Sequence, residues 1–365
     1  MNDLYIGLMS GTSLDGADGV LVDFSGPKLR VLANGTQAFS NEFRTELLAL
    51  NTPSHHELHR AALAANQLAE VYASVVKSLL EKTGLTAQDV QAIGAHGQTV
   101  RHQPTSGYTT QLNNPALLAE RTSIDVVADF RSRDVAAGGQ GAPLVPAFHQ
   151  SVFGQGSQTT LVLNIGGISN LSVLPATGQV LGFDCGPGNA LMDAWCFQHT
   201  GQHFDQDGQW AASGQGIPAL LASLLDEPYF SMPPPKSTGR DLFSMGWLAQ
   251  KLQAFTNAPP EDVQNTLTEF TARACITGTS SYLKYSKELI VCGGGAFNGY
   301  LMQRLQAGLP SLKVVSSETH GLPPLQVEAA AFAWLARQTT LRMPGNLPSV
   351  TGAAGLRVLG ATYPA

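Results

Sequence analysis

Residues 160–174, TLVLNIGGISNLSVL, decide the fold of this 365-residue chain because they hold two strands and the turn between them. The apolar run TLVLNI predicts a buried strand, Gly166 to Asn170 form a turn, and LSVL returns as a second strand. The chain then turns at Gly178 into VLGFD (180–184), a third strand. A strand, a glycine turn and two further strands predict the beginning of a β-sheet.

The start of the chain has the same order of elements. LYIGL (4–8) predicts a buried strand, a glycine-rich turn runs from Ser10 to Gly16, and GVLVDF (19–24) predicts the next strand. Residues 29–38 supply a third strand. The repeat predicts two related lobes.

Strands and helices alternate along the rest of the chain, which is typical of the α/β class. The longest predicted helix, 54–82, starts at a capping box formed by Ser54 and Glu57 and ends before Gly84. Further helices are expected at 190–199, 217–226, 262–283 and 324–340, and further strands at 90–95, 124–128 and 288–292.

The length of 365 residues exceeds what one compact core usually holds, and so predicts two lobes. We expect an N-terminal lobe at 1–130 and a C-terminal lobe at 131–365. The boundary falls within 130–158, where glycine and proline accumulate.

Composition excludes several classes of function. Hydrophobic residues make up 43% of the chain and charged residues 13%, which is a globular and not a disordered composition. The net charge is −6 and no basic run occurs, so nucleic acid is not an expected partner. No apolar run approaches the ~20 residues of a membrane span. The four cysteines form no C-x-x-C pair, which favours a reduced, cytoplasmic setting.

Three glycine-rich turns follow strands, at Ser10–Gly16, Gly166–Gly167 and Gly293–Gly295. Such turns present several backbone N–H groups in one direction, and phosphate oxygens bind to them. A single turn of this kind is weak evidence, whereas three together favour a phosphate-binding protein. The chain has no G-x-x-x-x-G-K-[ST] loop, no H-R-D loop, and no G-x-G-x-x-G after the first strand.

Asp184 is the candidate catalytic residue. It ends the strand VLGFD and precedes the turn Gly186-Pro187-Gly188, which places a carboxylate at the edge of the sheet. Such a group takes a proton from a hydroxyl or a water. The alternative role, capping the helix from residue 190, is better suited to Asn189, which is closer to that helix.

Three other residues are candidates for binding a substrate. Arg131 lies in the charged segment 129–134 and has a planar fork of donors, although that segment also fits a surface loop of ion pairs. Glu328 opens an alanine-rich helix, either as the N-terminal helix charge or as a group facing a cleft. His96 follows a strand, where histidines often have only a structural hydrogen bond.

Seven segments in order resemble one known family, anhydro-N-acetylmuramic acid kinase. They span about residues 5 to 340 and are IGLMSGTSLDGAD, AHGQTVRH, VVADFRSRDVAAGGQGAPLVP, LNIGGISN, GFDCGPGN, VCGGGAFN and LPPLQVEAAAFAWLA. The resemblance implies the actin/hexokinase/Hsp70 superfamily, with two ribonuclease H-like lobes flanking an ATP cleft.

The resemblance also implies site residues. The implied ATP-binding residues are Gly11, Thr12, Ser13, Leu14, Asp15, Gly16, Ala17, Asp18, Gly166 and Gly167, with Gly293, Gly294, Gly295 and Asn298 at the nucleoside end. Asp184 matches the catalytic aspartate, and Arg131, Glu328 and His96 fall on positions expected to contact the sugar.

The implied reaction opens 1,6-anhydro-N-acetylmuramic acid with water and phosphorylates O6, giving N-acetylmuramic acid 6-phosphate and ADP in cell-wall recycling. ATP and Mg²⁺ are the expected cofactors. The carboxylate that contacts the metal is left open, because Met9 and Ser10 stand where relatives in the superfamily have an aspartate. The oligomeric state is also left open, a homodimer included.

Two alternatives to this function remain at the sequence level. The first is a levoglucosan-type kinase that acts on plain 1,6-anhydroglucose by the same mechanism. The second is a non-catalytic sugar sensor or an actin-like assembly protein, although no helix-turn-helix segment precedes the first strand.

Overall fold

The computed structural model describes residues 3–11, 14–154, 156–234, 236–239 and 242–365, and the chain forms two compact units. The first unit comprises Met1–Val152 and Gln326–Ala365, and the second comprises Phe153–Leu325. The expected division into 1–130 and 131–365 differs from this one, because residues 131–152 and the last forty residues belong to the first unit. The reason is a helix after residue 326 that packs on the first sheet.

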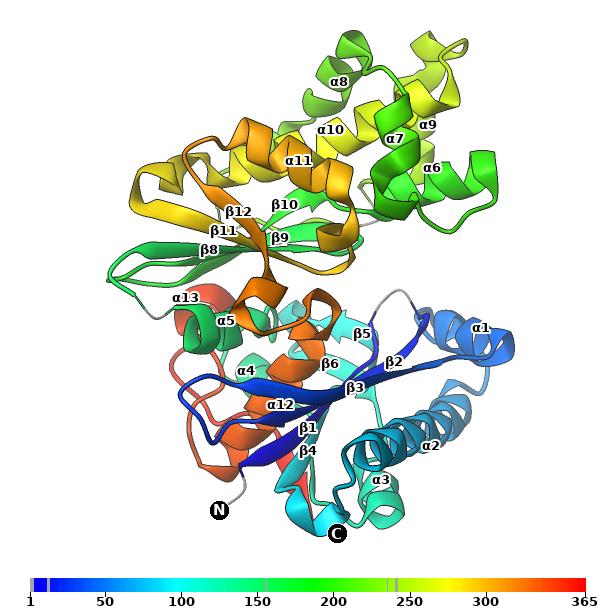
Figure 1. Ribbon diagram of the computed structural model, residues 1–365. Coiled ribbons are helices and arrows are strands. Elements are labelled where there is room, and N and C mark those ends of the chain that lie inside the picture. Colours follow the sequence, from blue (N-terminus) through cyan, green and yellow to red (C-terminus); the bar gives the residue numbers. More distant parts are fainter. Residues whose placement is uncertain (1–2, 12–13, 155, 235, 240–241) are drawn as a thin grey trace. The chain divides into compact units, whose positions relative to one another are not determined.

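The sheet of the first unit contains six strands (Figure 1). Their spatial order is β13 (Ala361–Tyr363), β7 (Val126–Ala128), β4 (Ala92–Ala95), β1 (Leu4–Met9), β2 (Gly16–Asp23) and β3 (Arg30–Ala38). Strand β2 is antiparallel to β1 and β3, whereas β1, β4 and β7 run parallel.

The sheet of the second unit repeats this topology with five strands. Their spatial order is β10 (Leu181–Pro187), β9 (Ile168–Leu174), β8 (Thr159–Ile165), β11 (Ser286–Cys292) and β12 (Lys313–Ser316). Strand β9 is antiparallel to both its neighbours, and β8, β11 and β12 run parallel. Counted in chain order within each sheet, both share the strand order 3-2-1-4-5, and β13 adds a sixth strand beside β7 in the first sheet. The predictions of an internal repeat and of two ribonuclease H-like lobes are confirmed.

Glycines let one helix lie directly on the first sheet. A Cβ on Gly7 of β1 would lie 1.8 Å from the carbonyl oxygen of Ala329, and a Cβ on Gly94 of β4 would lie 2.0 Å from that of Phe332. Both carbonyls belong to α12 (Val327–Thr340), and α2 (Glu57–Thr83) covers the other face of the sheet (Figure 1). Residues after 326 therefore complete the core of the first unit.

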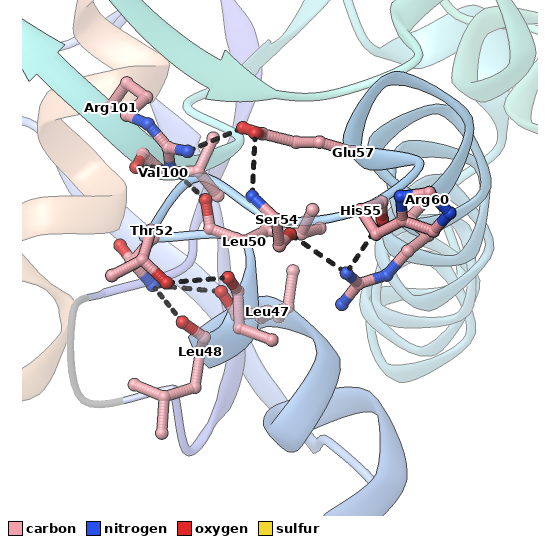
Figure 2. Close-up of polar contacts among 12 residues, drawn as sticks. Leu47, Leu48, Leu50, Thr52, Ser54, His55, Glu57, Arg60, Val100 and Arg101 are labelled. Atoms are coloured by element: carbon pink, nitrogen blue, oxygen red, sulfur yellow. Dashed lines mark hydrogen bonds and ion pairs between the residues drawn. The ribbon is translucent and has the colours of Figure 1, made fainter.

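The start of α2 differs from the expected capping box (Figure 2). The helix begins at Glu57 and not at Ser54. The Ser54 N–H donates to Glu57 at 3.4 Å, but the Ser54 hydroxyl accepts from Arg60 at 3.0 Å, so only half of the box forms. Glu57 also pairs with Arg101 at 2.6 Å. The predicted end is confirmed, because Gly84 caps the helix with φ = 67°.

In the second unit α10 (Pro260–Thr279) packs against β9 and β10. The other helices and the hairpin strands are α1 (Asn41–Ala49), α3 (Pro115–Thr122), α4 (Ser132–Ala136), α5 (Val145–Phe153), α6 (Ala190–Thr200), α7 (Gln209–Ser213), α8 (Pro218–Leu225), α9 (Met245–Lys251), α11 (Gly299–Gly308), α13 (Pro348–Thr351), β5 (Gln98–Gln103) and β6 (Tyr108–Leu112). In the described part of the chain, no helix combines the length and the apolar character that crossing a bilayer requires.

Candidate active site

Asp184 sits on a β-bulge in β10. It pairs with Asn170 of β9, but the next pair joins Gly186 to Ser169, so Cys185 is an extra residue in the strand. Gly186 has φ = 146°, and a Cβ there would lie 2.8 Å from the Phe230 ring. Bulges of this kind bend a strand and redirect its side chains. The bulge therefore sets the direction of the Asp184 carboxylate.

Three downstream residues, Tyr229, Lys236 and Thr238, hold Asp184 by hydrogen bonds. The Thr238 N–H donates to Asp184 Oδ2 at 2.9 Å, and the Asp184 N–H donates to the Lys236 carbonyl at 3.0 Å. The Tyr229 hydroxyl donates to the Asp184 carbonyl at 2.7 Å. No short pattern in the sequence links these residues to Asp184, because they are more than forty positions away.

The environment of the Asp184 carboxylate suits a general base. Burial raises its pKa above the usual range of a carboxyl, and the hydrogen bond from Thr238 opposes that shift. Among the described residues, no donor engages Oδ1, so this oxygen is available to take a proton. A carboxylate with a raised pKa is a stronger base than an ordinary one.

The glycine turn at Gly166–Gly167 interlocks with the segment after Asp184. The Gly166 carbonyl accepts from the Asn189 N–H at 2.8 Å, and the Gly167 carbonyl accepts from the Gly188 N–H at 2.9 Å. A Cβ on Gly188 would lie 2.2 Å from the Gly166 oxygen. The two N–H groups of the turn have no acceptor in the described chain, which is the property expected of a phosphate-binding turn.

The turn at Gly293–Gly295 packs on the end of β8, where the turn Gly166–Gly167 begins. Gly293 has φ = 77°, and its N–H donates to the Pro324 carbonyl at 3.0 Å. A Cβ on Gly295 would lie 2.4 Å from the Ile165 side chain. Close packing thus requires these glycines whether or not a ligand binds.

Asn298 has a structural role in the described chain. Its side-chain oxygen accepts from the Leu301 N–H at 2.9 Å and caps α11. The same oxygen is the atom that a Cβ on Gly208 would meet, at 2.2 Å.

The first unit carries the other predicted phosphate turn, between β1 and β2. Thr12 and Ser13 lie outside the described residues. Leu14 has φ = 59°, and its N–H donates to the Gly11 carbonyl at 3.3 Å. Asp15 is exposed and lies 3.5 Å from Arg44.

Strand β2 contains the last three residues predicted for this turn, Gly16, Ala17 and Asp18. Ala17 is fully buried. The Thr36 hydroxyl donates to Asp18 Oδ1 at 2.6 Å. Burial raises the pKa of Asp18, the Thr36 bond opposes the shift, and the charge of Asp15 adds to it.

His96 and Arg131 form a pair in the first unit. The Arg131 Nε and Nη2 groups lie 3.1 and 2.9 Å from His96 Nε2. A guanidinium only donates, so Nε2 accepts and the imidazole proton is on Nδ1. Burial, and then the charge of Arg131, holds the pKa of His96 well below its usual range. His96 is therefore a neutral group that orients Arg131.

Arg131 and Glu328 lie within electrostatic reach of each other. Burial lowers the pKa of Arg131 to about 10, and the charges of Glu328 and Asp134 oppose that shift. Loss of solvation around its carboxylate raises the pKa of Glu328, the charge of Arg131 opposes that shift and the charge of Asp18 adds to it, although the residue as a whole is exposed. In the segment 129–134, the described side chains form no ion pair, so the surface-loop interpretation of that segment is not supported.

Known proteins match this chain over nearly its whole length. The family model described as anhydro-N-acetylmuramic acid kinase matches residues 3–365. A curated protein of that name from Albidiferax ferrireducens is 65% identical, with 100% of each chain covered. Another from Variovorax paradoxus is 62% identical, over 100% of this chain and 99% of the relative.

Among solved structures, the activator of the 2-hydroxyisocaproyl-CoA dehydratase from Clostridium difficile matches with 11% identity and a TM-score of 0.48. The match covers 93% of this chain and 97% of that chain. A likeness at this TM-score carries no argument about function.

Proposed function

Because the chain belongs to the anhydro-N-acetylmuramic acid kinase family, we propose that it is an ATP-dependent carbohydrate kinase acting on 1,6-anhydro-N-acetylmuramic acid. The products are N-acetylmuramic acid 6-phosphate and ADP, as in the recycling of cell-wall peptidoglycan. The observation that carries the proposal is the family match over residues 3–365, and the geometry of Asp184 supports it.

In this proposal Asp184 is the general base. Its Oδ1 takes a proton from a water, whose oxygen bonds to C1 of the sugar while the bond from C1 to O6 breaks. O6 then bonds to the γ-phosphorus of ATP, and the bond to the β-phosphate oxygen breaks to release ADP. Base activation of the water resembles an inverting glycosidase, and transfer in line with the leaving oxygen resembles other kinases. Phosphorus captures O6, so no separate acid is needed.

We assign the ATP phosphates to the backbone of the turns Gly11–Asp18 and Gly166–Gly167, and the nucleoside end to Gly293–Gly295. The unpaired N–H groups at Gly166 and Gly167 support this assignment. Asn298 supports the turn at the nucleoside end, because its N–H donates to the Gly295 carbonyl at 3.1 Å and its side chain caps α11.

Mg²⁺ is expected to accompany ATP and to neutralise phosphate charge. The described residues contain no group of three or more histidine, cysteine or acidic side chains able to hold a metal. Mg²⁺ bound with phosphates needs only one or two carboxylates, so the residues present still fit it. We assign this role to Asp18, whose Thr36 bond occupies only Oδ1.

Arg131 is proposed to bind the sugar, with His96 orienting it and Glu328 beside it. Three of the five guanidinium N–H groups of Arg131 donate to His96 and the Gly141 carbonyl, which leaves two that can donate to a ligand. We also place the enzyme in the cytoplasm, because its four cysteines are buried and unpaired.

The test is ATP-dependent turnover of two purified sugars, 1,6-anhydro-N-acetylmuramic acid and 1,6-anhydroglucose. Formation of N-acetylmuramic acid 6-phosphate with equimolar ADP is the expected result. Turnover of anhydroglucose alone would replace this proposal with the levoglucosan-type kinase. ATP-driven sedimentation without turnover of either sugar would indicate an assembly protein.

A further inference from the structure

Asp134 is a fully buried carboxylate with no part in the reaction proposed above. It lies on α4, three residues after Arg131. Its Oδ1 accepts from Asn346 Nδ2 at 2.7 Å and from the Thr351 hydroxyl at 2.8 Å. Its Oδ2 accepts from the Gly141 N–H at 2.8 Å. Three donors satisfy this buried charge, and two of them come from the last twenty residues.

Gly141 connects Asp134 to Arg131. The peptide of Gly141 donates through its N–H to Asp134, and its carbonyl accepts from Arg131 Nη1 at 2.8 Å. Gly141 has φ = 68°, and a Cβ there would lie 2.8 Å from Val135, so its place in the loop is tightly fixed. The position of the Arg131 guanidinium therefore depends on the hydrogen bond between Asp134 and Gly141.

The segment 346–357 supports the same loop through its backbone. The Gln140 N–H donates to the Thr351 carbonyl at 2.7 Å, and the Ala354 N–H donates to the Ala137 carbonyl at 2.8 Å. Asn346 in turn accepts from the Arg357 N–H at 2.7 Å. The candidate site described above contains no residue of this segment.

We propose that Asp134, held by Asn346 and Thr351, is a positioning residue that sets the Arg131 guanidinium for binding the anhydrosugar. The inference rests on the proposed function, in which Arg131 contacts the sugar. In this arrangement the segment 346–357 acts on catalysis through Asp134 and Gly141, without touching substrate.

The test compares Asp134→Asn and Thr351→Val with Thr351→Ser. An amide at 134 places a donor against Gly141 or against the two side-chain donors, so the KM for the anhydrosugar should rise about 10- to 100-fold. Thr351→Val removes one of three donors and should raise that KM about 3- to 10-fold. Thr351→Ser keeps the hydroxyl and should restore the wild-type KM. The KM for ATP should stay unchanged in all three.

Thr339→Val is the matched control. Thr339 is also buried in the first unit, and its hydroxyl donates to the Leu359 carbonyl without contacting Asp134. The substitution should lower the melting temperature much as Thr351→Val does, and leave the KM for the sugar unchanged. An equal rise in the KM for the sugar in Thr351→Val and Thr339→Val would show that Asp134 has only a structural role.

A second readout needs no turnover. In protein labelled with ¹⁵N-histidine, His96 should show the tautomer with its proton on Nδ1, because Arg131 donates to Nε2. Asp134→Asn and Thr351→Val should weaken that signature, and Thr339→Val should not; the His96→Gln spectrum assigns the signal. An unchanged signature and KM in folded Asp134→Asn would overturn the proposal.

The two readouts separate this inference from the proposed function. A changed His96 signature with an unchanged sugar KM would show that Asp134 holds Arg131 but that Arg131 does not serve the sugar. If the wild-type enzyme turned over neither sugar, the His96 signature would still decide whether Asp134 positions Arg131.

Discussion

In the first unit the candidate site residues His96 and Arg131 follow β4 and β7, the fourth and fifth strands of the 3-2-1-4-5 order. In the second unit Asp184 lies within β10, the third strand of the same order. The first unit orients a cation through neutral partners, whereas the second holds an anion through a backbone N–H. One topology therefore places its candidate site residues on different strands, and in the second unit a β-bulge sets the direction of the side chain.

The packing of helices on the two sheets differs as well. Strands β1 and β4 carry Gly7 and Gly94, and the backbone of α12 lies against them. The corresponding central strands of the second unit, β8 and β11, contain no glycine. The central strands of the first sheet thus require close backbone contact with a helix, and the central strands of the second sheet have no such glycine contact.

The largest expected effect comes from replacing the carboxylate of Asp184, the anion held in the second unit. Asp184→Asn should fold and bind ATP, but kcat should fall at least ~100-fold, because the amide cannot accept the proton. The measurement is steady-state kinetics with a thermal melt. Asp226→Asn, at an exposed position of the same unit, is the control and should keep wild-type rates. A near-normal rate for Asp184→Asn would remove Asp184 from the mechanism.

Gly7→Ala tests the packing difference between the sheets. The added methyl would collide with the Ala329 carbonyl, so the free energy of unfolding of the first unit should fall by about 2 kcal/mol or more. Urea denaturation measures this change. Gly35→Ala on β3 is the control, because the nearest atom to its Cβ lies 3.7 Å away. Equal losses from both variants would contradict direct backbone contact at Gly7.

Arg131→Lys tests the cation of the first unit. A lysine cannot donate to His96 and Gly141 with the same planar fork, so the KM for the sugar should rise about tenfold while the KM for ATP stays constant. Arg133→Lys, on an exposed neighbour, should change neither value. If KM rises for ATP and not for the sugar, Arg131 belongs to the nucleotide and the assignment is wrong.

The smallest expected effect is a shift in the pH dependence of kcat/KM. Asp184 must be ionised to act as a base, so activity is lost as pH falls through its pKa. Burial raises that pKa, and the acid limb of kcat/KM should therefore lie above pH 3.8, the ordinary value. The pKa of His96 is lowered, by burial and then by the charge of Arg131. If the residual activity of Asp184→Asn still shows this acid limb, the limb belongs to another titrating group.

Much of this organisation could be predicted from local sequence patterns. The repeated strand and glycine turn identified both sheets, and the carboxylate at the end of VLGFD identified Asp184. The bulge at Cys185 could not be predicted, because register depends on pairing with β9. Asp134 lies in the charged segment 129–134, but its role could not be predicted, because its partners lie 212 and 217 positions away, beyond any local pattern.

The discontinuity of the first unit has a consequence for synthesis on the ribosome. All of Phe153–Leu325 emerges as one stretch, so the second unit is complete in sequence while α12 is still untranslated. The first sheet must wait with Gly7 and Gly94 uncovered until α12 arrives. The half of the protein that is translated first is thus the half whose core closes last, and during that interval it exposes apolar surface to chaperones.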